Sequence, residues 1–163
     1  MMRLVNECFF PAEKLANCLF TLSRESYTFG SPWTQEQFKA DICNEQSGYL
    51  VLEDTEILAY LCYHQFLDEM EIFNFAIAQK EQRKGYGHFL LENLNQIALT
   101  EQIKRIILEV RMSNQAAQKL YLKNGFDVIN RRADYYVKPT EDALVMTKKV
   151  RPEKKNERID IRN

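Results

Sequence analysis

Residues 71–99, which read EIFNFAIAQKEQRKGYGHFLLENLNQIAL, decide the predicted fold. The first eight are rich in aliphatic and aromatic residues, which predicts a β-strand. A polar loop follows, in which Gly85 and Gly87 precede a helix. The helix is predicted because apolar residues then recur at helical spacing along one face: Leu90, Leu94, Ile97 and Ala98. The stretch therefore predicts a strand, a glycine loop and a helix in succession.

The loop Gln82-Arg83-Lys84-Gly85-Tyr86-Gly87 is the first candidate binding site. Glycines let the backbone approach an anion closely, and the free N–H groups of a helix start point toward it. Arg83, Lys84 and His88 add basic side chains at this end. Two known phosphate loops are excluded, because a P-loop requires Gly-Lys-Ser/Thr and the dinucleotide fingerprint requires a glycine where this chain has Leu90. Two glycines at a helix start are equally typical of a simple turn, so both interpretations stay open.

The patterns outside this stretch predict one mixed α/β domain over residues 1–150. The remaining elements are predicted at the following residues: helices 11–25 and 34–43, strands 49–53, 57–64 and 105–111, helix 114–123, and closing strands 126–132 and 143–149. Thr34 and Gln37 form a capping-box pattern at one helix start, and Gly125 ends the last helix.

Composition excludes several classes of protein. The chain has 163 residues, 45% of them hydrophobic and 28% charged, and its net charge of −1 argues against a general nucleic-acid binder. No apolar run approaches the roughly 18 residues of a membrane helix and residues 1–7 show no signal-peptide pattern, so we expect a cytoplasmic protein without a membrane partner. Residues 151–163 are basic and predict a disordered tail, with a ribosome or nucleic-acid tether as the alternative.

The four cysteines, Cys8, Cys18, Cys43 and Cys62, form no closely spaced pair. We therefore expect neither a structural zinc site nor a disulfide framework, but reduced thiols that are buried or half-buried. Cys62 and His64 share one face of a strand, as a nucleophile pair would. No orienting third group is visible in the sequence, so core packing is the favoured interpretation.

The strand at 105–111 contains the second candidate site. Alternation places Ile107, Glu109 and Arg111 on one face and three aliphatic residues on the other. A carboxylate in mid-strand indicates a wet, paired or functional face, and surface charge is the simpler alternative. Tyr121 lies on an apolar stripe of the next helix, where a core tyrosine is the ordinary interpretation.

The order of these features resembles the GNAT superfamily of N-acetyltransferases. The likeness runs from about Phe10 to Val150 and rests on the Gln82-x-x-Gly85-x-Gly87 loop and on Leu120-Tyr121-x-x-x-Gly125-Phe126. It implies a single GNAT-like domain with a mixed, mostly antiparallel sheet flanked by about four helices.

A closer resemblance is to the RimI-type family, which acetylates the N-terminal alanine of a small-subunit ribosomal protein. The matching residues stand in several segments: Pro32-Trp33, Phe73-Asn74-Phe75-Ala76-Ile77, Leu108-Glu109-Val110-Arg111-x-Ser113-Asn114, Ala116-Ala117, Tyr135-Tyr136 and Glu141-Asp142-Ala143. Two residues depart from the family pattern. His88 replaces a common arginine, and Lys138 lies between Tyr136 and Pro139.

The resemblance implies roles for the candidate residues. Glu109 is the general base and Tyr121 the general acid of a direct transfer in a ternary complex, without a metal. Acetyl-CoA, the co-substrate, is implied along Phe75, Ala76 and Ile77, on the loop residues and against Asn114; the loop residues are Arg83, Lys84, Gly85, Tyr86, Gly87 and His88. The acceptor, a basic ribosomal-protein N-terminus, is expected near Pro32, Trp33, Tyr135 and Tyr136. The alternatives are a small-molecule amine or lysine as acceptor, and a non-catalytic acyl-CoA-binding module.

Overall fold

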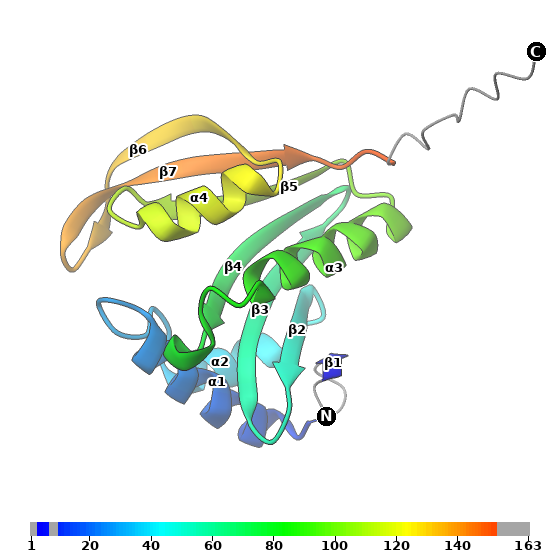
Figure 1. Cartoon of the computed structure of the whole chain (residues 1–163), viewed down its shortest axis with the longest axis vertical. Coiled ribbons are helices and arrows are strands. Elements are labelled where there is room, and N and C mark those ends of the chain that lie inside the picture. Colours follow the sequence, from blue (N-terminus) through cyan, green and yellow to red (C-terminus); the bar gives the residue numbers. More distant parts are fainter. Residues whose placement is uncertain (1–2, 7–9, 153–163) are drawn as a thin grey trace, which may run out of the picture.

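The computed structural model describes residues 3–6 and 10–152. Its elements lie, in chain order, at these residues: β1 Arg3–Asn6, α1 Ala12–Ser26, α2 Gln35–Ile42, β2 Ser47–Glu53, β3 Ile57–Phe66, β4 Glu69–Ile77, the 3₁₀ turn η2 Gln79–Glu81, α3 Tyr86–Thr100, β5 Arg105–Arg111, α4 Gln115–Lys123, β6 Asp127–Val137 and β7 Thr140–Lys149. Figure 1 shows these elements arranged around one twisted sheet.

The sheet has seven strands in the order β1-β2-β3-β4-β5-β7-β6. All neighbouring strands are antiparallel except β4 and β5, which pair in parallel from Glu69–Arg105 to Ile72–Leu108. Beyond Ile72 the two strands separate, as Figure 1 shows, although β4 continues to Ile77 and β5 to Arg111. The predicted fold, one domain with a mixed, mostly antiparallel sheet and about four helices, is confirmed.

Helices cover both faces of the sheet, so the domain has two hydrophobic clusters. The α3 and α4 side contains Leu90, Leu94 and Ala98, the stripe predicted from helical spacing, packed on the interior of β3–β5 and β7. The α1 and α2 side contains Leu15, Leu19 and Phe38 against β2, β3 and Ala76 of β4. Each helix therefore buries its one apolar stripe on one face of the sheet.

A bulge in β4 changes which side chains face each cluster. Tyr63 of β3 is opposite Ile72 and Cys62 is opposite Asn74, so Phe73 is an extra residue. An inserted residue reverses the alternation of the strand. Ile72 accordingly packs with the α3 side, whereas Ala76 packs with the α1 side and Phe75 turns toward α3 and α4.

Most predicted element boundaries agree with the structure to within a few residues. The capping box of Thr34 and Gln37 is formed, and Asn114 caps α4 by accepting the Ala117 N–H. One expectation was wrong: α3 begins at Tyr86, so Gly87 lies inside the helix and not before it. The edge strand β1 was not predicted. The closing strands are also longer than expected, because β6 and β7 continue as a hairpin to Val137 and Thr140.

The cysteine expectation holds only in part. Cys62 is buried, but Cys18, on α1, and Cys43, the C-cap residue of α2, are exposed. Cys8 lies outside the described residues, and so does the predicted tail beyond Pro152. Val150 still donates its N–H to the Lys104 carbonyl at 2.9 Å, so ordered contacts reach the predicted domain boundary. Within the described part of the chain, no helix is long and apolar enough to cross a membrane.

Candidate active site

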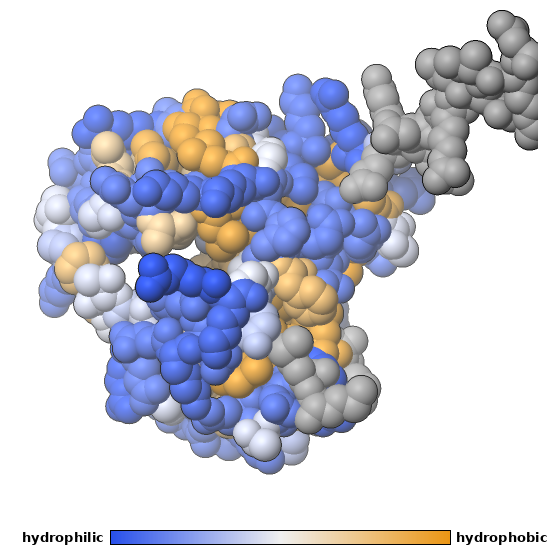
Figure 2. Space-filling view, in the orientation of Figure 1, coloured by the Kyte–Doolittle hydropathy of each residue, from blue (hydrophilic) through white to orange (hydrophobic). Residues whose placement is uncertain are grey.

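The separation of β4 from β5 leaves an opening in the middle of the sheet. Backbone groups of β4 beyond Ile72 have no neighbouring strand on that side. The Phe75 N–H donates instead to the Tyr27 hydroxyl, at 3.1 Å, and the Ile77 carbonyl accepts from Gln82 Nε2 at 3.3 Å. Figure 2 shows the surface hollowed between the half that holds β5–β7 and the half that holds α1. A substrate entering here can bind this strand backbone by displacing the side chains that now occupy it.

The glycine loop lies at the end of β4 and forms the start of α3. Gly85 is the N-cap residue with φ +88°, a conformation that favours glycine, and no side chain caps the first turn. Gly87 is buried, and a Cβ there would lie 2.7 Å from Leu120 Cδ2. The first N–H groups of α3 therefore remain available for an anion, with Arg83 and Lys84 exposed beside them.

The other residues predicted to contact acyl-CoA differ in whether their polar groups are already engaged by the protein. His88 Nδ1 lies 2.7 Å from Asn124 Oδ1 at the C-terminal end of α4, so this ring is already engaged by the protein. Asn114 uses its side-chain oxygen to cap α4 and is otherwise exposed. Ala76 faces the α1 side, whereas Phe75 and Ile77 pack on the α3 side together with Tyr86.

Glu109 lies on β5 with its side chain on the α1 side of the sheet, as the alternation predicted. Only 14% of its side chain is exposed, and Oε1 lies 2.8 Å from Arg132 Nη1. Tyr135 also donates a hydrogen bond to this carboxylate, which raises the pKa of the tyrosine. Glu109 is thus half-buried and paired, not the solvated surface charge that was the simpler alternative.

A second carboxylate, Glu71, shares this face of the sheet. Glu71 stands opposite His64 on β3 and opposite Ile107 on β5, one alternation from Glu109. Burial, and then the negative charge of Glu109, raise the pKa of Glu71. Among the described residues Glu71 forms no ion pair, so this part of the face carries excess negative charge.

Tyr121 approaches the opening from the opposite side, on α4. Its side chain is 7% exposed and packs against Phe75, with ring centroids 6.4 Å apart, and against Phe126 at 5.6 Å. Burial raises the pKa of Tyr121 well above its usual range, with further contributions from Tyr27 and Tyr136. The phenol is therefore protonated at neutral pH.

The hairpin of β6 and β7 meets the loop between α1 and α2 over the guanidinium of Arg111. Arg111 Cζ lies 4.1 Å from the Tyr136 ring and 4.8 Å from the Phe29 ring, and Nη1 is 3.0 Å from Glu141 Oε2. Cation–π contacts of this kind hold two segments together. Arg111, which the alternation marked only as a charge, joins the two segments expected to bind the acceptor.

The predicted acceptor residues are divided between this junction and the core. Tyr135 is 44% exposed and packs edge-on against Tyr136. Pro32 is exposed, but Trp33 is half-buried and packs edge-on against Phe38 in the α1-side cluster.

Cys62 and His64 belong to a polar cluster on the α1 side of the sheet. Asp41 at the end of α2 accepts hydrogen bonds from Ser47 at 3.0 Å, from Cys62 at 3.3 Å and from Tyr49, and its Oδ1 lies 2.5 Å from His64 Nε2. Ligand atoms of Asp41, Cys62 and His64 lie within 4.8 Å of one another. Asp41 is the third group that a Cys62–His64 nucleophile pair would need, and the sequence did not reveal it. It bonds to both Cys62 and His64, however, and so anchors α2 to the sheet.

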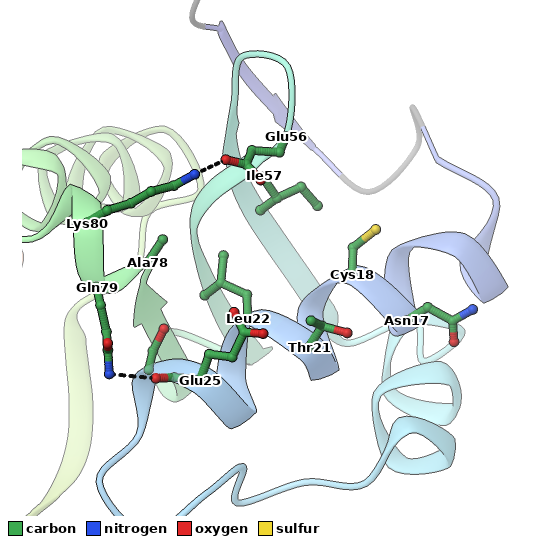
Figure 3. Close-up of a pocket in the computed structure, with 11 residues that line it drawn as sticks. Asn17, Cys18, Thr21, Leu22, Glu25, Glu56, Ile57, Ala78, Gln79 and Lys80 are labelled. Carbon is green, nitrogen blue, oxygen red and sulfur yellow. Dashed lines mark hydrogen bonds and ion pairs between the residues drawn. The ribbon is translucent and has the colours of Figure 1, made fainter.

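A separate pocket of about 620 Å³ lies between α1 and the ends of β3 and β4. Its lining includes Thr21 and Leu22 but none of the predicted catalytic residues. Figure 3 shows the Lys80–Glu56 ion pair and the hydrogen bond from Gln79 to the Glu25 carbonyl spanning this pocket. The reaction site is therefore assigned to the β4–β5 opening and not to this pocket.

Three residues of the site were not identified from the sequence, because they belong to no recognised motif: Tyr27, Glu71 and Arg132. Tyr27 directly follows α1. It is 47 residues from Asn74 in the sequence, so no local pattern indicates that the two side chains are in contact. An acidic residue in the β4 pattern is the only signal that could have drawn attention to Glu71.

Comparison with known proteins agrees with this geometry. Residues 12–126 match the model of the acetyltransferase (GNAT) family. The chain belongs to the GNAT family. A ribosomal protein bS18-alanine N-acetyltransferase from Salmonella typhimurium is 37% identical over 122 residues, which cover 71% of this chain and 79% of that protein.

Solved GNAT structures give the same result for the fold. An alanine N-acetyltransferase of the same ribosomal protein, from Escherichia coli, has a TM-score of 0.82 at 26% identity, covering 96% of this chain and 98% of that one. A GNAT family acetyltransferase from Elizabethkingia anophelis, solved with acetyl-CoA bound, has a TM-score of 0.72 at 17% identity, covering 91% and 97%. At that identity the likeness concerns the fold alone.

Proposed function

We propose that this protein transfers the acetyl group of acetyl-CoA to the α-amine of an N-terminal alanine, on a basic peptide such as the N-terminus of a small-subunit ribosomal protein. The observation that carries the proposal is the placement of Glu109 and Tyr121 on opposite sides of the β4–β5 opening, with the Phe75 N–H between the strands. The RimI-type relatives support the acceptor, and the GNAT family supports the donor.

The residues present fit acetyl-CoA as the donor. The uncapped start of α3, with Gly85 at positive φ, suits the pyrophosphate, and Arg83 and Lys84 add positive charge. Phe75 and Ile77 offer backbone groups along the opening, and Asn114 stands at the start of α4. When bound, acetyl-CoA supplies an activated thioester.

The proposed reaction is a direct transfer within a ternary complex. An ammonium cannot attack a thioester, so Glu109 takes a proton from the acceptor, directly or through water. The Phe75 N–H then stabilises the negative charge that develops on the thioester oxygen. Tyr121, protonated because burial raises its pKa, donates to the departing thiolate. Neither a metal nor a cysteine intermediate is part of this proposal.

The charge of the acceptor face supports a basic peptide. Glu71 and Glu109 lie on one face, and the residues outside 148–163 carry a net charge of −5. Glu109 already pairs with Arg132, which shows that this face accepts a guanidinium. The exposed Tyr135 adds an aromatic surface for an extended chain.

An α-amine also suits the chemistry better than lysine does. Its pKa is about 7.7–8.0 against about 10.4 for lysine, so far more of it is neutral at pH 7. A carboxylate base therefore needs less driving force to complete its deprotonation.

Release of free thiol from acetyl-CoA tests the proposal with three acceptors: an alanine-initiated arginine-rich peptide, the same peptide with a blocked N-terminus and free lysines, and a polyamine. We expect fast turnover with the first only, and a loss of about 10² to 10⁴ in kcat for Glu109→Gln. Turnover with the polyamine or the blocked peptide would indicate the small-amine or lysine alternative. Acetyl-CoA binding without turnover on any acceptor would indicate a non-catalytic module.

A further inference from the structure

Tyr27 occupies a position in the opening that the mechanism above does not use. It is the C-cap residue of α1, and its hydroxyl accepts the Phe75 N–H at 3.1 Å and donates to Asn74 Oδ1 at 3.1 Å. The Phe75 N–H is the group that the separation of β4 from β5 leaves without a strand partner. Because an unpaired N–H is costly, an oxygen atom is expected there, and Tyr27 provides it.

The position of this oxygen coincides with a place that the reaction needs. A hydrogen bond to an N–H confines its acceptor to about 2.7–3.2 Å along the N–H direction. A thioester oxygen that uses the Phe75 N–H must enter that same region, so it must displace the Tyr27 hydroxyl by a short distance. A hydroxyl displaced in this way remains next to the oxygen, with its proton free to turn.

The Tyr27 hydroxyl can turn away from Asn74 without leaving Asn74 Oδ1 unpaired. Asn74 Oδ1 also accepts from the Tyr60 hydroxyl at 2.6 Å, so the amide oxygen keeps a donor when Tyr27 turns away. Asn74 is 1% exposed, and its Nδ2 has no hydrogen-bond partner in the described part of the chain. Among the described residues, Asn74 Nδ2 is thus a buried donor without an acceptor, so the cluster has hydrogen-bond donors to spare for an incoming oxygen atom.

Tyr27 remains a proton donor under physiological conditions. Burial raises the pKa of Tyr27 to about 12, so the phenol is neutral at pH 7. Tyr121 and Tyr27 both border the space beside Phe75, because the Tyr121 ring lies 6.4 Å from the Phe75 ring and Tyr27 binds the Phe75 N–H. Tyr27 lies on the α1 side of that space and Tyr121 on the α4 side.

We propose that Tyr27 is a further catalytic residue, whose hydroxyl donates, beside the Phe75 N–H, to the thioester oxygen during acetyl transfer. This inference rests on the proposed reaction at the β4–β5 opening. As the amine nitrogen bonds to the carbonyl carbon, the C=O electron pair moves to oxygen, and two donors stabilise it. When the C–S bond breaks, the pair returns to form the amide carbonyl, and Tyr27 retains its proton throughout.

The test compares Tyr27→Phe with Tyr60→Phe, a matched control that removes the other phenol hydrogen bond to Asn74 Oδ1 without touching the Phe75 N–H. We expect kcat to fall by about 10²-fold in Tyr27→Phe, as for loss of one oxyanion donor. We expect Tyr60→Phe to lose much less kcat than Tyr27→Phe, because it leaves both donors in place and removes only the second donor to Asn74 Oδ1. Acetyl-CoA affinity, measured by calorimetry, should be nearly unchanged in both variants.

A second readout does not depend on turnover. In the free enzyme, the Phe75 amide resonance should shift in Tyr27→Phe and not in Tyr60→Phe. Unchanged kcat with tighter acetyl-CoA binding in Tyr27→Phe would overturn the proposal, because it would make Tyr27 only a placeholder. Equal losses in both variants would also overturn it, by assigning the effect to Asn74. Ratios to wild type are taken with whichever acceptor is active, so failure of the alanine acceptor would leave this test intact.

Discussion

Arg132 Nη1 lies 2.8 Å from Glu109 Oε1, so the proposed base is paired with a cation of its own chain. The Arg132 side chain is 53% exposed, so it can move away when the acceptor enters. The acceptor ammonium must compete with it for the carboxylate. Arg132→Gln is therefore expected to lower the KM for an alanine-initiated peptide by about threefold, a typical value for a partly exposed ion pair.

Arg131→Gln is the matched control for this prediction, because Arg131 pairs with Asp142 on the same hairpin and not with Glu109. Steady-state kinetics at several salt concentrations measure both variants. A higher KM in Arg132→Gln would show that Arg132 binds the acceptor.

Glu71 is expected to recognise a basic side chain of the acceptor. It forms no ion pair among the described residues and faces the same side as Glu109. Glu71→Gln should raise the KM for arginine-rich peptides by about fivefold and leave peptides without basic residues unchanged. An equal effect on both peptides would contradict this role.

Glu71→Gln is also expected to change the thermal stability of the protein in a pH-dependent way. Burial and Glu109 raise the pKa of Glu71 above its unfolded value, so its ionisation is harder in the folded state. The stability linked to this group is present at low pH and is lost as pH rises through the raised pKa. Glu71→Gln should therefore have a higher Tm than wild type at pH 7 and the same Tm near pH 4. Thermal unfolding at both values measures the difference, and equal curves at pH 7 would contradict it.

The glycine loop can be tested with two glycines that share one geometry. Gly85 and Gly30 both have positive φ, +88° and +79°, and a Cβ on either would meet nothing within 4 Å. Alanine at each should cost about 1–2 kcal/mol of backbone strain. Only Gly85→Ala should weaken acetyl-CoA binding, measured by calorimetry, because Gly85 is the N-cap residue of α3. Equal affinity in both variants would show that the loop is only a turn.

Tyr121 gives a prediction for alkaline pH. Burial raises its pKa far above the ordinary value of about 10, so the phenol does not ionise between pH 8 and 10. Wild-type kcat should not decline through loss of this proton in that range. Tyr121→Phe should lower kcat by about 10² to 10⁴ at every pH. A decline of wild-type kcat near pH 10 that is absent in Tyr121→Phe would contradict the prediction, because it would show that Tyr121 has an ordinary pKa.

Local patterns predicted most of the fold, because helices and strands repeat their apolar residues at fixed spacings. The capping box at Thr34 and the alternation around Glu109 both agree with the structure. The strand β1 was not predicted, because its four residues are too few to show a period. The bulge at Phe73 was not predicted either, because it depends on the register between β3 and β4.

The candidate site was only partly predictable for the same reason. Glu109, Tyr121 and the glycine loop lie in motifs, so the resemblance named them. The contacts of Tyr27 with Phe75, of Arg132 with Glu109 and of Asp41 with His64 join residues that are 23 to 48 positions apart in the sequence. Only tertiary packing brings Tyr27 to Phe75, or Arg132 to Glu109, and no local pattern encodes such a contact.

The central claim is that the acceptor is the α-amine of an N-terminal alanine. Its most direct test uses one arginine-rich peptide that begins with alanine and also contains free lysines. After reaction with acetyl-CoA, fragmentation by mass spectrometry locates the added acetyl group. The proposed function predicts that nearly all of it lies on the alanine α-amine, whereas acetyl found mainly on lysine would contradict the claim.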